Sequence, residues 1–484
     1  MNRMENRVYR MLINGQLLST GEAFGVLNPA TGKQFASAPT AALHHVEEAL
    51  DSAREGFRVW SATPQSRRSE MLLRAASLLE ENRTDLELLL SKEQGKPLPS
   101  AVAETNTAIA SFRAVADLIL PTKIIKETPT HFLTVRRKPV GVVLAITPWN
   151  YPLGIGCGKI ARALGHGNSV ILKPSPFTPL TSLFMGELLQ GVFPAGVLNV
   201  VSGDGSVGAQ LVESPKINLV SFTGSVLTGK RIMAACANNM TRVLLELGGN
   251  DPAIVLPDAD VLHAAKGIFA MSMNNSGQIC CAVKRVYVHD SLHDSFVREV
   301  VRLAEEAVMS IGEGTTEGVK MGPLNNKPQL DRVIDLIADA VRNGGTLLAG
   351  GAPPPHADAA GFFLAPTIIT NVQEGIRLVD EEQFGPVMPI MKYSLESEVV
   401  TRANDSQLGL GASVWGTDSV AVNRVANQLE AGIVWTNEHA VLREGGPFGG
   451  MKQSGFRREG DFAEADLDAY TEVQTIKIAK TKTS

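Results

Sequence analysis

The middle of this chain alternates short apolar runs with segments of helical spacing, and this alternation is its strongest constraint on fold. Short apolar strands separated by helices are typical of a parallel sheet that is covered on both faces. Such doubly wound sheets bind nucleotides at the carboxyl ends of their strands. The apolar runs are 140–146, 169–172, 197–201, 219–222 and 243–245, and the helical segments are 153–164, 179–190, 207–212 and 227–237.

After Gly248 and Gly249 the pattern begins again, which predicts a second α/β domain. We expect strands at 253–256 and 286–289, and helices at 259–275, 292–309 and 328–342. A chain of 484 residues exceeds the size of one hydrophobic core, so two or three domains are expected. The assignment is a nucleotide-binding domain at 1–120 and 140–248, followed by a second domain at 249–453.

The first 120 residues read as a short antiparallel opening followed by helices. We expect a strand at 8–13, a helix at 44–60 and one long amphipathic helix from about 65 to 94. A third helix is expected from about 101 to 118. The stretch 122–138 alternates weakly and ends in a charge run, so it favours an exposed hairpin whose edge can pair with another subunit.

Composition excludes several classes of function. Lys and Arg number 45 against 50 Asp and Glu, a formal net charge of −5, and no basic block suggests nucleic acid as a partner. The apolar runs are shorter than the roughly 20 residues that a membrane span needs. The four cysteines lack zinc-type spacing, so we expect no metal site, no disulfide framework and a cytoplasmic location.

Cys280 follows a Gly-Gln turn and is read as a catalytic nucleophile. A thiolate attacks carbonyls at neutral pH only where its surroundings lower the pKa below the usual value of about 8.5. The segment before it looks helical, and Gly277 would end that helix and leave backbone amides free to face bound charge. The alternative is that Cys280 and Cys281 are buried packing residues.

Seven separated stretches resemble the aldehyde dehydrogenase superfamily, in the family's order and over nearly the whole chain. Each stretch alone is a weak signal, but their order makes chance resemblance remote. They are TPWNYP at 147–152, LKPS at 172–175, FTGS at 222–225, LELGG at 245–249, GQIC at 277–280, EEQFGP at 381–386, and PFGG at 447–450 with KQSG at 452–455.

The resemblance implies an enzyme that oxidises an aldehyde to the acid with NAD or NADP. Cys280 would add to the aldehyde, while the Asn150 amide and the Cys280 N–H stabilise the oxyanion. After hydride transfer, Glu246 would direct water onto the thioester, and its place between two leucines should raise its pKa toward neutrality. Lys159 completes the implied catalytic set.

The resemblance also implies the cofactor contacts. A glycine turn spaced GxxxxG would open a helix toward the pyrophosphate, Lys173 would bind the adenosine ribose, and Glu382 with Phe384 would hold the nicotinamide end. NAD-preferring relatives often carry a glutamate where this chain has Pro176, which leaves NAD or NADP open. The contact residues are Thr147, Pro148, Trp149, Lys173, Ser175, Pro176, Gly205, Phe222, Thr223, Gly224, Ser225, Thr228, Leu247, Gly248, Glu382 and Phe384.

The resemblance also implies which residues line the substrate tunnel and which elements pair the subunits. Glycines alternate through the helix after Asn150, which favours a wide tunnel and a medium or large aliphatic or aromatic aldehyde. The hairpin at 121–139 and the terminal strand at 469–480 resemble a subunit-pairing element, so a homodimer or homotetramer is expected. The implied tunnel residues are Tyr151, Gly154, Gly158, Asn274, Ile279, Leu442 and Phe448.

Three alternatives stay open at this point. A semialdehyde dehydrogenase for carboxylate-bearing aldehydes is disfavoured, because Gly158 and Asn274 stand where such relatives carry arginines. A coenzyme-A-acylating relative would usually lack the glutamate found at Glu246. A cysteine hydrolase would need a histidine base near Cys280, and His263 and His289 lie in no recognisable motif.

Overall fold

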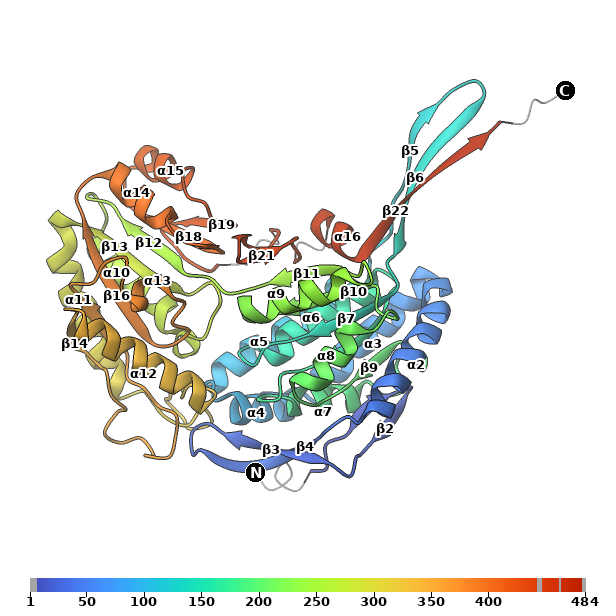
Figure 1. Ribbon diagram of the computed structural model, residues 1–484, viewed down its shortest axis with the longest axis horizontal. Coiled ribbons are helices and arrows are strands. Elements are labelled where there is room, and N and C mark those ends of the chain that lie inside the picture. Colours follow the sequence, from blue (N-terminus) through green and yellow to red (C-terminus); the bar gives the residue numbers. More distant parts are fainter. Residues whose placement is uncertain (1–6, 442–445, 461–462, 481–484) are drawn as a thin grey trace.

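A computed structural model describes residues 7–441, 446–460 and 463–480. Figure 1 shows two α/β parts side by side, with a β ribbon projecting from one of them. The fold class is the expected one, with two doubly wound, mainly parallel sheets and a small separate β element.

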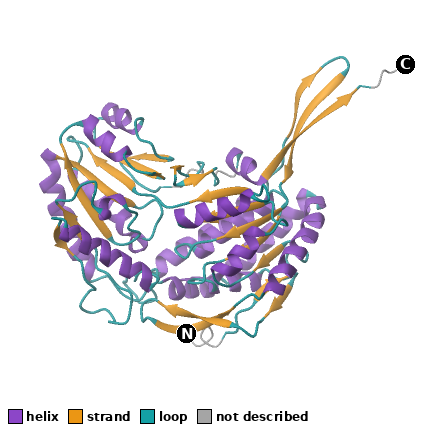
Figure 2. Cartoon of the chain, in the orientation of Figure 1, coloured by secondary structure: helices purple, strands orange, loops and turns teal. Residues whose placement is uncertain are grey.

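The first sheet has eight strands, and helices cover both of its faces (Figure 2). Its parallel centre, β9-β8-β7-β10-β11, contains the five apolar runs of the sequence. Antiparallel strands extend both edges. In sheet order the strands are β2 (Gln16–Leu18), β1 (Met11–Ile13), β9 (Leu198–Val200), β8 (Ser169–Lys173), β7 (Val142–Ile146), β10 (Leu219–Thr223), β11 (Arg242–Glu246) and β21 (Gly455–Phe456).

The helices of this part follow the apolar periodicity with one correction. The single long helix expected at 65–94 is two helices, because the Asn82 side chain donates to Leu78 O and its backbone leaves helical geometry. The helices are α2 (Leu43–Ala62), α3 (Gln65–Glu81), α4 (Arg83–Gln94), α5 (Leu98–Ala114), α6 (Pro152–Gly165), α7 (Leu180–Leu188), α8 (Gly205–Glu213) and α9 (Val226–Ala237).

The second sheet has seven strands, of which only β14 is antiparallel to its neighbour. The sequence predicted two of them. In sheet order they are β14 (Thr346–Ala349), β15 (Thr367–Thr370), β16 (Val387–Tyr393), β13 (Val283–His289), β12 (Asp251–Val255), β18 (Gly411–Trp415) and β19 (Ile433–Thr436). The helices of this part are α10 (Val261–Met273), α11 (Asp290–Val308), α12 (Lys327–Arg342), α13 (Arg377–Asp380), α14 (Glu396–Asn404) and α15 (Ser419–Ala426), whereas α16 (Glu464–Tyr470) packs against α6 of the first part.

Three small β elements complete the chain. The hairpin β3 (Ala23–Asn28) and β4 (Lys33–Pro39) lies beneath the first part, and β17 (Leu408–Gly409) pairs with β20 (Met451–Lys452). The projecting ribbon joins β5 (Thr122–Glu127), β6 (His131–Pro139) and β22 (Thr471–Ala479). Two segments far apart in sequence therefore form one sheet.

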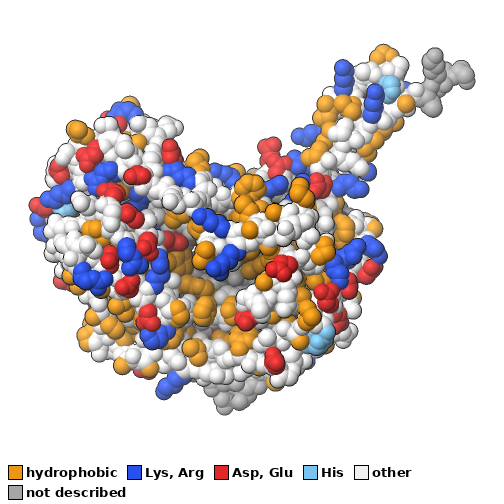
Figure 3. Space-filling model, in the orientation of Figure 1, with side chains coloured by type: hydrophobic (Ala, Val, Ile, Leu, Met, Phe, Trp, Pro, Cys, Tyr) orange, Lys and Arg blue, Asp and Glu red, His pale blue; other side chains and the backbone are white. Residues whose placement is uncertain are grey.

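The hydrophobic core is divided as the sheets are. One large cluster surrounds the first sheet, and separate clusters cover the two faces of the second. The space-filling view shows basic and acidic side chains interspersed and the face hollowed between the two parts (Figure 3). Within the described ranges, no helix combines the length and apolarity needed to cross a membrane.

Candidate active site

The loops expected to hold the cofactor leave the carboxyl edge of four adjacent strands. Register aligns Ile146 of β7 with Lys173 of β8 and with Phe222 of β10, and aligns Thr223 of β10 with Glu246 of β11. The loops that begin near 147, 174, 224 and 247 therefore start at the same edge. Parallel strands that end together place their following loops side by side, so the sheet gathers these loops into one site.

Polar groups on this edge fit a dinucleotide. Lys173 is 4% exposed, burial lowers its pKa to about 8, and no ion-pair partner for it occurs within the described ranges. The Thr147 hydroxyl is buried and has no hydrogen-bond partner in the described part of the chain. Ser225 caps α9 by accepting from Thr228 N at 3.3 Å, which aligns the positive end of that helix with the edge. A buried cation, a free hydroxyl and a helix N-terminus suit ribose and pyrophosphate groups.

The candidate nucleophile Cys280 lies after an unusual turn and not directly after a helix that ends at a glycine. α10 ends at Met273, and a 3₁₀ turn follows at Asn274–Gly277, so the helix expected at 259–275 is shorter. Asn275 and Ser276 adopt left-handed backbone, and the Asn275 side chain donates to Asn150 O at 3.2 Å. This polar anchoring explains the early helix end.

Gly277 is required by a close backbone approach. Its φ is +73°, and a Cβ there would lie 2.1 Å from Gly385 O. Only glycine fits a left-handed position this crowded. The turn before Cys280 is thereby packed against the loop that carries Glu382 and Phe384.

The two adjacent cysteines differ in their surroundings. Cys280 is partly buried, and its pKa is lowered by the hydrogen bond from Cys281 and by the charge of Lys284. Cys281 is buried, and the same hydrogen bond together with desolvation raises its pKa. The thiolate is therefore favoured at Cys280.

Asn150 lies directly against the nucleophile turn. Its side-chain Nδ2 donates to Gln278 O at 2.8 Å. Its backbone oxygen accepts from the buried Lys96 Nζ at 2.9 Å, and Lys96 pairs with Glu104. Sequence reasoning missed Lys96 and Glu104, although a lysine inside the apolar Gly-Lys-Pro turn is a signal that could have found the first.

Glu246 ends β11 with a carboxylate that is 3% exposed. Neither oxygen has a hydrogen-bond partner in the described part of the chain. Burial and the nearby charge of Glu459 raise its pKa well above the ordinary value, while Lys159 opposes the rise. The expected upward direction of the Glu246 pKa is the direction found.

Lys159 belongs to a buried polar network behind Glu246. Its Nζ donates to Ser221 Oγ and to Glu459 Oε1, each at 2.8 Å, and Tyr470 OH donates to Glu459 Oε2 at 2.9 Å. Sequence reasoning missed Glu459 and Tyr470. In the run Arg-Arg-Glu-Gly nothing distinguishes Glu459 from a surface charge, because its burial depends on contacts from α6.

The loop after α13 supplies the remaining expected cofactor contacts. Glu382 Oε1 accepts from Gly249 N at 3.1 Å, and a Cβ at Gly248 would lie 2.1 Å from Oε2. The Phe384 and Trp149 rings meet edge-on, 5.2 Å apart at 87°. This contact joins loops from the two sheets.

The remaining expected cofactor residues lie near the same edge. Ser175 and Leu247 are buried, and Leu247 packs against the position of a Cβ on Gly229. Gly205 begins α8. Pro148, Pro176, Thr223 and Gly224 are partly exposed.

An apolar cluster surrounds the two cysteines. Tyr151, Ile279 and Phe448, three of the expected tunnel residues, pack there with Leu410 and Trp435. Asn274 is exposed at the end of α10. Leu442 lies outside the described residues.

The glycines of α6 serve close packing. A Cβ at Gly154 would lie 3.1 Å from Glu104 Cγ, and one at Gly156 would meet Leu172 of β8 at 3.7 Å. A Cβ at Gly158 would lie 2.8 Å from Arg162 Nη1. The space beside Gly158 is therefore partly filled by the Arg162 side chain.

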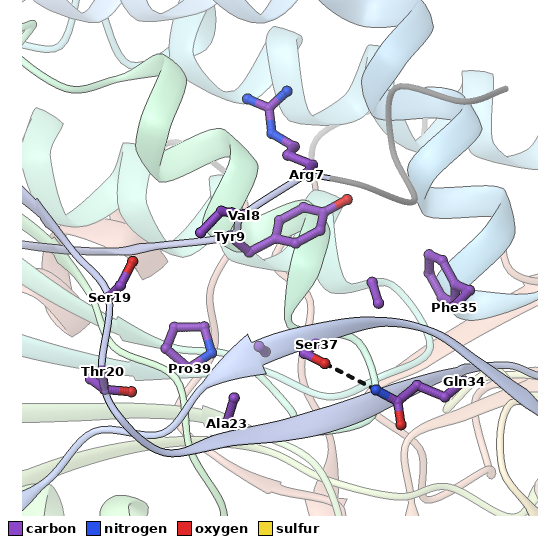
Figure 4. Close-up of a pocket in the computed structure, with 12 residues that line it drawn as sticks. Arg7, Val8, Tyr9, Ser19, Thr20, Ala23, Gln34, Phe35, Ser37 and Pro39 are labelled. Atoms are coloured by element: carbon purple, nitrogen blue, oxygen red, sulfur yellow. Dashed lines mark hydrogen bonds between the residues drawn. The ribbon is translucent and has the colours of Figure 1, made fainter.

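A separate surface pocket lies near the N-terminal strand (Figure 4). It is lined by Arg7, Tyr9 and Phe35, and by Gln34, which donates to Ser37 at 3.0 Å. None of the expected site residues lies there. Within the described ranges no group of three or more His, Cys, Asp or Glu is arranged to hold a metal ion.

Comparison with known proteins identifies the class. The model of the aldehyde dehydrogenase family matches residues 17–476. Phenylacetaldehyde dehydrogenase from Pseudomonas fluorescens is 39% identical over 490 aligned positions, covering 97% of this chain and 96% of that relative.

Solved structures agree. The NAD⁺ complex of an aldehyde dehydrogenase from Bacillus cereus superposes with a TM-score of 0.94 at 36% identity, covering 98% of this chain and 97% of that one. Betaine aldehyde dehydrogenase from Staphylococcus aureus with NAD⁺ gives 0.93 at 33% identity, covering 98% and 96%.

The family model and the superposed NAD⁺ complexes define the class as a nucleotide-dependent oxidoreductase. The chain belongs to the aldehyde dehydrogenase family. It is an NAD(P)-dependent enzyme that oxidises aldehydes.

Proposed function

We propose that Cys280, Asn150, Glu246 and Lys159 carry this oxidation. The observation that carries the assignment is the Asn150 Nδ2 to Gln278 O bond, which holds the oxyanion asparagine against the turn of the nucleophile. The lowered pKa of Cys280 and the unpaired, buried Glu246 support the same roles.

In the first half of the reaction the Cys280 thiolate adds to the aldehyde carbon. The carbonyl oxygen becomes an oxyanion, and the Asn150 amide and the Cys280 N–H donate to it. A bound nicotinamide would accept the hydride that leaves this carbon, which would then be a thioester of Cys280. Lys173, Ser225, Glu382 and the loops of the carboxyl edge would hold that cofactor.

In the second half Glu246 takes a proton from a water molecule as the water attacks the thioester. The acid leaves, and Cys280 is released as the thiolate. A glutamate with an ordinary pKa would be a weaker base, so the burial of Glu246 favours this step. Lys159 limits the rise of that pKa.

Paired variants test the nucleophile. Cys280→Ala should abolish aldehyde oxidation and leave cofactor binding near that of the native enzyme, because the thiol lies apart from the ribose and pyrophosphate contacts. Cys281→Ala is the matched control and should be mild. Steady-state rates with cofactor titration by fluorescence measure both, and an essential Cys281 would move the nucleophile by one residue.

The proposed substrate is a medium or large aliphatic or aromatic aldehyde. The apolar cluster of Tyr151, Ile279 and Phe448 beside Cys280 supports this class, as does the phenylacetaldehyde dehydrogenase relative. A panel of kcat/KM values for phenylacetaldehyde, benzaldehyde, hexanal, acetaldehyde and succinate semialdehyde tests it. Superiority of acetaldehyde would contradict the apolar site.

The second candidate is an aldehyde that carries a carboxylate, and succinate semialdehyde in the same panel would reveal it. A coenzyme-A-acylating activity is less favoured, because Glu246 is present for hydrolysis.

Pro176 supports use of NADP as well as NAD, since no carboxylate stands there to repel a 2′-phosphate. We also propose a cytoplasmic location, which the four free thiols support.

A further inference from the structure

We propose that Lys284 is a positioning residue that aims the N–H of Cys280 at the oxyanion and balances the charge around the nucleophile. The inference rests on the proposed role of Cys280. It concerns a lysine that neither the motifs nor the mechanism above uses.

Lys284 lies at the start of β13 with its side chain 3% exposed. Its Nζ donates to Ile279 O at 2.9 Å and to Cys280 O at 2.5 Å. The ammonium therefore holds the carbonyl groups on both sides of the Cys280 residue. A buried ammonium finds its partners in such carbonyls, and hydrogen bonds to a charged donor are stronger than neutral ones.

The first of these bonds fixes the direction of an amide. Ile279 C=O and Cys280 N–H belong to one planar trans peptide, so they point in opposite directions. With the oxygen held toward Lys284, the N–H points to the other side of the peptide. No backbone acceptor for that N–H occurs in the described part of the chain.

The same ammonium also polarises the peptide. Withdrawal of charge at the Ile279 oxygen makes the Cys280 N–H a stronger donor, because hydrogen bonds in a chain reinforce one another. Lys284 thus acts on the oxyanion through the backbone and never touches the substrate.

Several acidic groups surround the nucleophile, and Lys284 offsets them. Its Nζ lies 3.5 Å from Glu382 Oε1, and Glu382 and Asp251 both disfavour a thiolate at Cys280. Removing the ammonium would leave these carboxylates unopposed. The titratable groups that face Cys280 are Cys281, Tyr151, Glu246 of β11, Asp251 of β12, Lys284 of β13 and Glu382 of the loop after α13, with His439 behind Cys281.

The test follows alkylation of Cys280 by iodoacetamide across pH, in cofactor-free protein, with the labelled peptide identified by mass spectrometry. In Lys284→Met the midpoint of the rate should rise by about one pH unit, because a neighbouring cation is lost. Glu382→Gln should move it the opposite way. These readouts need no catalysis and no bound cofactor.

Kinetics separate positioning from charge. Loss of an aligned oxyanion donor should lower kcat of Lys284→Met by about 10²-fold, with KM for the cofactor little changed. Lys284→Arg should restore much of both effects. Lys284→Gln keeps a hydrogen-bond donor but lacks the charge. It should therefore restore more of the lost kcat than of the shift in the alkylation midpoint. The same variant replaces Lys284→Met if that protein fails to fold.

The matched control is Lys452→Met. Lys452 also donates to two backbone carbonyls and pairs with a glutamate, Glu430, but it lies at the β17–β20 pair. Its alkylation midpoint should equal that of the native protein.

The inference would be overturned if folded Lys284→Met kept the native alkylation midpoint and the native kcat. A lower melting temperature of that variant, with both values unchanged, would show that Lys284 has only a structural role. A wrong assignment of the nucleophile would give a different result, because iodoacetamide would then label Cys281 in place of Cys280.

Discussion

At the scale of single residues, Glu246 combines a proposed catalytic role with a cost in stability. Its carboxylate is buried and lacks hydrogen-bond partners among the described residues, so the folded protein favours the protonated form. The folded pKa therefore exceeds the unfolded value of about 4.3. Stability from this group is present below the unfolded pKa and is lost as pH rises through the folded pKa.

Glu246→Gln should consequently raise Tm more at mildly alkaline pH than at acidic pH. Glutamine keeps the shape and removes the buried charge, so the gain grows as the native carboxyl ionises. Thermal melts of both proteins at two pH values measure the difference. Equal shifts at both values would mean that Glu246 is neutral, or already stabilised, throughout.

The same variant separates the two halves of the reaction. Cys280 can still form the thioester in Glu246→Gln, but hydrolysis lacks its base. Pre-steady-state absorbance should show one burst of reduced cofactor per site, followed by slow turnover. Absence of the burst would assign Glu246 to activation of the thiol.

At the scale of elements, the turn at Asn274–Gly277 sets the position of the nucleophile. Gly277→Ala would force a Cβ into the Gly385 carbonyl and strain a φ of +73°. We expect a loss of about 1–3 kcal/mol in the free energy of unfolding and a displaced Cys280. Denaturant melts and the alkylation rate of Cys280 test this, and Gly375→Ala, also at positive φ but with open space around it, is the control.

Some elements of the fold could be predicted from the sequence, and others could not. The central strands β7, β8 and β10 were predictable because continuous apolar runs have one common explanation, a strand buried on both faces. The break at Asn82 and the turn after α10 were not, because each depends on a side-chain bond that local periodicity does not encode.

The candidate site divides in the same way. Cys280, Asn150 and Glu246 were recognisable from motifs, each of which is contiguous in sequence. Lys96, Lys284 and Glu459 were not, because their contacts are with backbone atoms or with partners far away along the chain. The filling of the space beside Gly158 by Arg162 likewise required coordinates.

At the scale of the whole molecule, the ribbon of β5, β6 and β22 is the element through which we expect subunits to pair. All six residues of β5 are exposed, and Ile124, Ile125, Val473 and Ile478 present apolar side chains on it. A long, unpaired edge with this surface favours strand pairing with another copy. We therefore propose a homodimer or homotetramer.

Light scattering of the native protein should give a multiple of the 51.7 kDa chain mass at micromolar concentration. Ile124→Lys with Val473→Lys should shift the mass toward the monomer, because charge on the ribbon opposes pairing. Leu395→Lys, at an exposed leucine outside the ribbon, is the control and should leave the mass unchanged. A native protein of monomer mass would contradict the proposal.

One edge of the first sheet, beside β11, is formed by a strand that comes much later in the sequence, β21. β21 pairs with β11 beside Glu246, and Tyr470 donates to Glu459 in the network of Lys159. The chain is synthesised from its N-terminus to its C-terminus. The strand β11 therefore has no β21 beside it until the second sheet has been synthesised. Nascent chains should therefore show an open, aggregation-prone edge, and catalysis should begin only after the last strands are translated.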